Sequence, residues 1–161
     1  MMRKLLTVVA IAAALTSGAL AGARQEAKVV MPTDPGRLKV WESWGFCDAI
    51  IVGDTVYLSG VVASTKEGDA NLEAAYTRAF DRLGETLNKA GASWDDVVDI
   101  TTFHTDLTTQ MPAITAVKNR YIRAPFPAWT AIGVSRLIPD KGLTEIKMVA
   151  KLPARMMPVR Q

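Results

Sequence analysis

Hydrophobic residues recur with a helical period in the middle of the chain. Between residues 71 and 90 they lie three or four positions apart and therefore share one face of a helix: Leu72, Ala75, Tyr76, Ala79, Phe80, Leu83, Leu87 and Ala90. Asp69 or Asn71 can cap the start of this helix, and Gly91 stands where helices commonly end. The pattern predicts an amphipathic helix packed against a core.

A second helix is predicted after residues 106–110. Pro112 fits its first turn, where the missing N–H removes no hydrogen bond. Its apolar face is supplied by Ile114, Val117 and Tyr121. Pro125 and Pro127 end the segment, because proline does not continue a helix.

Strand-like runs surround both helices. The apolar runs 49–52 and 55–59 are separated by Gly53-Asp54, which is the spacing of a tight hairpin. Residues 97–105, 129–137 and 145–152 are rich in residues that favour strands. The order β-β-α-β-α-β-β predicts one α+β domain, a mixed β-sheet with two helices packed on one face.

The remaining segments lack a regular pattern. Residues 24–45 contain Pro32, Pro35 and Gly36 and are predicted to form an irregular N-terminal arm. Residues 61–69 are predicted to be a loop, and 140–142 a turn. No linker divides the chain after the arm, so we assign one domain to residues 46–155 and a tail to residues 156–161.

The first residues have the layout of a secretory signal peptide. Arg3 and Lys4 precede an apolar run, and overlapping A-x-A cleavage patterns follow at residues 19–23. The run is too short to span a bilayer comfortably. We predict a signal peptide over residues 1–23, a periplasmic or secreted protein, and no membrane association after cleavage. An uncleaved anchor is the alternative.

Removal of that segment changes what the charge implies. The whole chain has 19 basic and 16 acidic residues, a net charge of +3. Residues 1–23 hold two of the basic residues and no acid, so the net charge falls to +1. No basic run remains, and we expect no nucleic-acid partner.

Few groups are available for metal or cofactor chemistry. The single cysteine, Cys47, excludes an intrachain disulfide and a cysteine-based zinc site, and the chain has one histidine. The sequence contains no phosphate loop and no dinucleotide fingerprint. We therefore predict no metal site and no cofactor. Cys47 is interpreted as structural, with a reactive thiol as the alternative.

Three positions are candidates for chemistry. His104 and Asp106 share a face of a predicted strand and could orient a base, although a structural histidine is the preferred interpretation. Glu145 opens an apolar strand, where its carboxylate could hold an attacking water or could simply be solvated. Trp129 follows a proline-rich lead and either lines a pocket or anchors the core.

Three motifs resemble those of the RidA (YjgF/YER057c/UK114) family. Residues 53–60, GDTVYLSG, resemble its early hairpin, and residues 89–98 look like its central segment. Residues 127–134, PAWTAIGV, followed by Leu137 and by residues 144–150, TEIKMVA, are similar to its C-terminal signature. The resemblance covers roughly residues 44–152.

The resemblance implies a chorismate-mutase-like fold and a homotrimer with sites in the clefts between subunits. Known members hydrolyse reactive enamines and imines, such as 2-aminoacrylate, to ketoacids and ammonia without a cofactor. In those members an arginine after the Pro-Ala of the signature binds the substrate carboxylate. A glutamate in the last strand positions the attacking water.

Carried onto this chain, the family pattern makes Glu145 the catalytic residue. Ser59 matches the serine of the family's Ser-Gly pair, Phe46 stands at the position of a tyrosine, and Trp129 stands at the position of the arginine. Gly60, Thr130 and Ala131 complete the predicted substrate-binding set. Without a guanidinium at position 129, the substrate preference is expected to shift away from small amino-acid-derived enamines.

Three functions from different classes remain open on these residues. The first is hydrolysis of an imine, enamine or similarly activated small molecule, with Glu145 as the base that positions water. The second is a trimer that binds a small molecule without catalysis, with Trp129 and Phe46 stacked on an apolar ligand. The third is a role in binding a partner protein.

Overall fold

The computed structural model of the protein describes residues 22–153. Residues 1–21 and 154–161 lie outside the described part, and with them nearly all of the predicted signal peptide and the whole predicted tail. Among residues 22–153, no helix is both long enough and apolar enough to cross a membrane.

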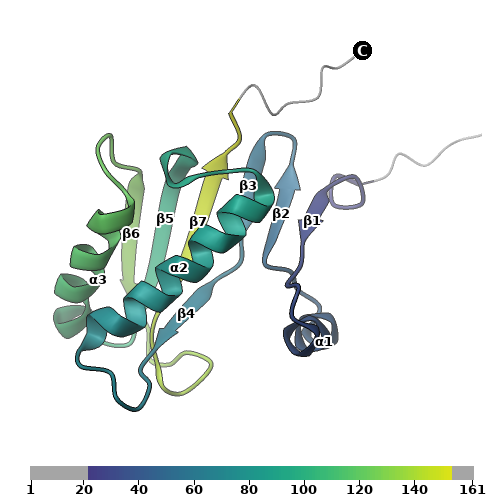
Figure 1. Ribbon diagram of the computed structural model, residues 1–161. Helices are drawn as coiled ribbons and strands as arrows, with labels where there is room; N and C mark the ends of the chain where they lie inside the picture. Colours follow the sequence, from purple (N-terminus) through teal and green to yellow (C-terminus); the bar gives the residue numbers. More distant parts are fainter. Residues whose placement is uncertain (1–21, 154–161) are drawn as a thin grey trace, which may run out of the picture.

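A mixed β-sheet of seven strands forms the centre of the fold (Figure 1). Its strands are β1 (Lys28–Val30), β2 (Ala49–Val52), β3 (Thr55–Leu58), β4 (Val61–Ser64), β5 (Val97–His104), β6 (Ala128–Gly133) and β7 (Gly142–Lys151). Their order in space is β1-β2-β3-β7-β5-β6, and β4 also pairs with β7. Only β5 and β6 are parallel, and every other pair is antiparallel.

Two helices cover one face of this sheet, α2 (Leu72–Ala90) and α3 (Leu107–Tyr121) (Figure 1). Helix α2 connects β4 to β5 and α3 connects β5 to β6, and these three strands run in the same direction. Such crossovers are right-handed, and both proceed toward β6, so both helices lie on the same face. The predicted α+β class is confirmed.

The core lies between the sheet and α2. The predicted caps are present: the Asn71 side chain accepts a hydrogen bond from the Ala74 N–H at 3.3 Å, and Gly91 ends the helix with φ 85°. The predicted apolar face is buried, with Tyr76 and Phe80 fully inaccessible. Each such side chain contributes roughly 1.5–3 kcal/mol through the surface it removes from water.

The predicted N-terminal arm over residues 24–45 is not irregular, and this part of the prediction is wrong. It forms β1 and a third helix, α1 (Pro35–Trp44). Asp34 caps the first turn, Pro35 occupies its first position, and Gly45 ends the helix with φ 72°. No residue of α1 is buried. The sequence of α1 therefore lacks the apolar periodicity that predicts a helix, although it contains both capping residues, Asp34 and Gly45.

Helix α1 is attached to the domain through a cluster of charged and aromatic side chains. The buried carboxylate of Asp48 accepts a hydrogen bond from Trp41 Nε1 at 3.0 Å. The same oxygen, Asp48 Oδ1, lies 3.4 Å from Arg37 Nη2 and 3.6 Å from Nη2 of Arg82 on α2. Both guanidinium groups lie over the Trp41 ring, 5.4 and 5.2 Å from a ring centroid. We call these four residues the Asp48 cluster.

Other boundaries differ from the prediction near the site. The predicted loop over residues 61–69 begins with β4, in which Val61 and Ala63 alternate into the core. Strand β6 ends at Gly133, and β7 begins at Gly142, earlier than predicted. Residues 134–141 therefore form a connection rather than the end of a strand.

His104 is fully buried at the end of β5, which supports its preferred interpretation as a structural residue. Its Nε2 lies 2.8 Å from Thr102 Oγ1 and its Nδ1 lies 3.0 Å from Thr144 Oγ1. The Thr144 hydroxyl also lies 2.8 Å from Tyr76 OH. Asp106 instead caps α3. The alternative, a pair between His104 and Asp106, is not present in the structure.

Acid should weaken the fold through His104. Burial lowers the pKa of this imidazole below its ordinary 6.5. As pH falls below about 6.5, the unfolded chain binds a proton that the folded chain excludes, so the free energy of unfolding falls. Above that pH the effect is absent. Urea midpoints at pH 7.5 and 5.5 should differ in the wild type and differ less in His104→Gln. An equal pH dependence in both proteins would contradict the assignment.

Candidate functional site

Glu145 projects from β7 onto the open face of the sheet, opposite the helices. Its neighbours Thr144 and Ile146 are fully buried on the helical side, and strand alternation directs Glu145 to the other side. Val62 of β4 and Phe103 of β5 flank it in register. Among residues 22–153, Glu145 takes part in no ion pair. Its carboxylate is therefore free to bind water or a ligand.

Gly60 lies directly beneath the Glu145 side chain. A Cβ at position 60 would lie 2.7 Å from Glu145 Cδ and 2.8 Å from its Cγ, closer than carbon atoms pack. Gly60 does not have a positive φ, so the position requires space rather than left-handed backbone. The glycine is what allows the carboxylate to lie at this point of the sheet.

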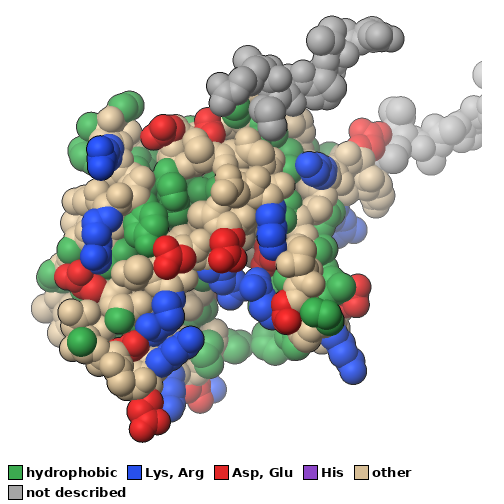
Figure 2. Space-filling model, viewed as in Figure 1, with side chains coloured by type: hydrophobic (Ala, Val, Ile, Leu, Met, Phe, Trp, Pro, Cys, Tyr) green, Lys and Arg blue, Asp and Glu red, His purple; other side chains and the backbone are tan. Residues whose placement is uncertain are grey.

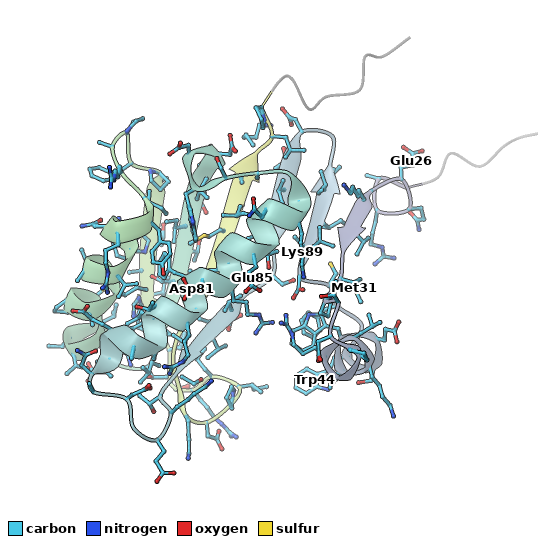
Figure 3. The ribbon with its side chains drawn as sticks, in the orientation of Figure 1. Glu26, Met31, Trp44, Asp81, Glu85 and Lys89 are labelled. Carbon is cyan, nitrogen blue, oxygen red and sulfur yellow. The ribbon has the colours of Figure 1, made fainter. Side chains whose placement is uncertain are left out.

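A cavity of about 690 Å³ opens beside Glu145. Four predicted site residues line it, namely Phe46, Ser59, Gly60 and Glu145. The rest of its lining is Trp44, Val62, Arg136, Leu137 and Ile138. Trp44 is 65% exposed and Ile138 71% exposed, so large apolar side chains are open to a ligand. Figure 3 shows Trp44 at the end of α1, on the side toward β4.

Ser59 shapes the cavity by holding the chain that leads into it. Its Oγ donates to the Cys47 carbonyl oxygen at 2.6 Å, and its N–H donates to the Asp48 carbonyl oxygen at 2.9 Å. The adjacent Phe46 packs on Trp41 with ring centroids 4.6 Å apart. Burial, together with the Asp48 carboxylate, raises the pKa of the Cys47 thiol, which disfavours the reactive thiolate.

The other predicted site residues, Trp129, Thr130 and Ala131, lie on β6 at an edge of the sheet. Trp129 pairs in register with the buried Ile100 and packs against the core. Its Nε1 donates to Thr102 Oγ1 at 3.0 Å, and Lys118 Nζ lies 5.1 Å from its ring. Within one chain these three residues do not line the cavity beside Glu145.

The described residues contain no cluster suited to a metal ion. Across residues 22–153, no three His, Cys, Asp or Glu side chains come together as ligands. The charged groups at the cavity are Glu145 and Arg136, and the latter pairs with Asp140 at 2.7 Å. The chemistry that this arrangement supports is carboxylate-assisted attack by water on a ligand held by apolar walls.

Comparison with known proteins assigns the chain to a family. The family described as Endoribonuclease L-PSP matches residues 42–152, well over half of the chain, and includes both groups of predicted site residues. The chain belongs to the RidA/YjgF family. The resemblance inferred from the sequence motifs is thus confirmed.

Relatives within the RidA/YjgF family cover most of the chain. The RutC family protein YjgH of Escherichia coli is 38% identical over 122 residues, 73% of this chain and 91% of that protein. A 2-iminobutanoate/2-iminopropanoate deaminase of Dermatophagoides farinae is 33% identical over 110 residues, 65% of this chain and 83% of that protein.

Solved structures show the same fold. A structure of protein YjgH has a TM-score of 0.67 at 36% identity and covers 80% of this chain and 98% of that one. Rv2704 of Mycobacterium tuberculosis, a YjgF/YER057c/UK114 family member, also has a TM-score of 0.67, covering 78% of this chain and 99% of its own. At 22% identity, the second likeness concerns the fold alone.

The sequence analysis did not predict several residues that line the cavity of this RidA/YjgF protein. Trp44 was not predicted as a site residue because its helix, α1, has no apolar period, although Asp34-Pro35 and Gly45 mark the two ends of the helix. Val62 was assigned to a loop although Val61 and Ala63 alternate around it. Arg136 and Leu137 were predicted to end a strand, and Ile138 was assigned to no element; all three lie in the connection between β6 and β7.

Proposed function

We propose that this protein hydrolyses imines or enamines of small molecules at the cavity beside Glu145. The observation that carries the proposal is the free Glu145 carboxylate, which lies over Gly60 among apolar walls. The deaminase name of one relative supports the same reaction class.

The reaction needs one base and one water. An enamine moves a proton from nitrogen to its β-carbon and becomes the isomeric imine. Glu145 accepts a proton from water as the water oxygen bonds to the imine carbon, and it passes that proton to the nitrogen, so that a neutral carbinolamine forms. The carbinolamine hydroxyl then gives its proton to the nitrogen through Glu145, the C–N bond breaks, and ammonia leaves a carbonyl compound. Both protons of the water molecule end on nitrogen, and the oxygen stays with the product.

The substrate preference is shifted away from small amino-acid-derived enamines. The family resemblance places a carboxylate-binding arginine at position 129, and this chain has Trp129 there. Its single N–H already donates to Thr102, and its ring packs against the core. An indole in that state supplies no charged fork for a carboxylate. The walls formed by Trp44, Phe46 and Ile138 favour a larger, apolar substrate.

The functional unit is proposed to be a homotrimer with sites in the clefts between subunits. The open face of the sheet leaves large apolar side chains accessible, with Tyr57 45% and Ile132 43% exposed. A neighbouring subunit would cover them and could bring the β6 edge, with Thr130 and Ala131, to the cavity. Light scattering should report roughly three times the chain mass. A monomer that persists at all concentrations would contradict this prediction.

Hydrolysis can be tested directly with purified protein. A panel of imines that differ in size and polarity should release carbonyl product faster with the protein than without it, and aromatic imines should be preferred over 2-aminoacrylate. If no member is accelerated, the second candidate, a ligand-binding trimer without catalysis, is favoured. The exposed Trp44 ring supports that candidate, because it offers an apolar face on which a ligand can stack, and its fluorescence would report the bound ligand.

We further propose that the reaction takes place in the periplasm or outside the cell. The basis is the signal-like layout of residues 1–23. Mass spectrometry of protein from its native host should find an N-terminus at Gly22 or Arg24. Mature protein that retains Met1 would contradict this localisation.

A further inference from the structure

The cavity beside Glu145 continues into a second compartment of about 400 Å³. The two share five lining residues, Trp44, Phe46, Gly60, Val62 and Ile138. The second compartment is completed by Val40, Trp41, Ser64, Arg82 and Pro139. One elongated cavity therefore runs from Glu145 toward helix α2, with apolar side chains along its length.

The charged groups at the far end of this cavity are all cationic. Among the described residues, Arg82 is the only charged one that lines the second compartment. A smaller hollow of about 180 Å³ adjoins it through Arg82, and its charged lining is Lys66, Arg78 and Arg82. Arg78 is already paired with Asp69 at 2.7 Å, which leaves Lys66 and Arg82 as the cations there. No described carboxylate lines either space. Figure 2 shows basic side chains beside a hollow next to α2, with acidic side chains adjoining them along the helix.

Arg82 is partly buried, with a side-chain exposure of 32%, and it does not have a carboxylate partner to itself. It shares the Asp48 carboxylate with Arg37, and that carboxylate also accepts from Trp41. The buried Nε atoms of Arg82 and Arg37 have no hydrogen-bond partner within residues 22–153. Burial, and then the second guanidinium, lower the pKa of Arg82, and Glu85 on α2 forms no ion pair with it. An anion beside Arg82 would offset this deficit.

We propose that Arg82 binds a carboxylate of the ligand at the end of the cavity remote from Glu145. The ligand is then an elongated organic acid, with an apolar or aromatic body on Trp44, Phe46 and Ile138 and its reactive carbon at Glu145. This inference rests on the proposed function only for the place of the reaction. Arg82 would then bind the anionic group that Trp129 cannot bind.

The test compares an acid with its neutral counterpart. Titration calorimetry of the purified protein with 4-phenylbutanoate and 4-phenylbutanamide should show at least tenfold tighter binding of the acid, a difference of about 1.4 kcal/mol. Arg82→Met keeps much of the apolar stem and should bind both compounds with similar affinity. Lys89→Met removes the same charge from the same helix, outside the cavity, and should retain the preference.

Three results would overturn the proposal. The wild type could bind both compounds equally, Arg82→Met could keep the preference, or Arg136→Met alone could lose it, which would place the anion at the other end. If Arg82→Met does not fold, phenylglyoxal labelling of the wild type replaces it. The acid, but not the amide, should protect Arg82 from modification, and equal labelling would contradict the proposal.

Failure of hydrolysis is distinguishable from failure of this inference. Both phenylbutanoate and its amide bind without turnover, so the affinity difference does not depend on catalysis. In Glu145→Gln the preference for the acid should persist while hydrolysis is lost. A wild type that shows the preference but hydrolyses no imine would keep the anion site and reject the enzyme.

Discussion

Replacing Glu145 by glutamine should reduce imine hydrolysis by about 10²–10⁴-fold, the usual contribution of a general base. Glutamine is nearly isosteric and fits over Gly60 as glutamate does, but it cannot accept a proton from water. Initial rates with the best imine of the panel would measure the loss, and light scattering would check that the assembly is unchanged. Undiminished turnover in the folded variant would remove Glu145 from the mechanism.

Gly60→Ala tests the same site without changing the carboxylate. The added Cβ would lie 2.7 Å from Glu145 Cδ, so the flexible glutamate side chain must move away. Turnover should therefore fall nearly as far as in Glu145→Gln, while the unfolding transition stays close to that of the wild type. Gly36→Ala is the matched control, because its Cβ would meet only Asp34 Oδ1, at 3.4 Å, and the residue lies outside the cavity.

Trp129→Ala should lower the free energy of unfolding by about 3 kcal/mol, the lower end of the range for a large aromatic, because the ring is only half-buried. The variant also leaves the buried Thr102 hydroxyl without its indole donor. Urea unfolding would measure the change.

Trp44→Ala is the counterpart in the same chain. Its ring is 65% exposed and lines the cavity, so stability should change by less than about 0.5 kcal/mol while ligand affinity falls. A loss of ligand affinity in Trp129→Ala, with little change in stability, would instead support a cleft-lining role for Trp129.

The Glu145 part of the site was accessible from the sequence because short motifs fix it. The pair Ser59-Gly60 lies in the short connection between β3 and β4, and Glu145 lies on β7, whose alternation sets the side that it faces. The long helix α2 was equally predictable, because its buried residues recur with the helical period. In both cases local pattern and tertiary packing agree.

Helix α1, which supplies Trp44 to the cavity, and the position of Trp129 could not be predicted in the same way. Helix α1 buries no residue, so its sequence carries caps without a period. The register that brings Trp129 beside Ile100 depends on pairing between strands about thirty residues apart. Motif alignment identifies which residue replaces the arginine, but the side that it faces is decided by β5 and α3.

The weak hold on α1 has a dynamic consequence. A helix of ten residues is marginal alone in water, and this one is retained by the Asp48 cluster rather than by the core. Its amide protons should exchange with solvent through local opening, far faster than those at the centre of α2. We therefore expect α1, which forms one side of the cavity, to open locally before the rest and so to admit a bulky molecule. A ligand that touches both Trp44 and Arg82 would close it again and slow that exchange.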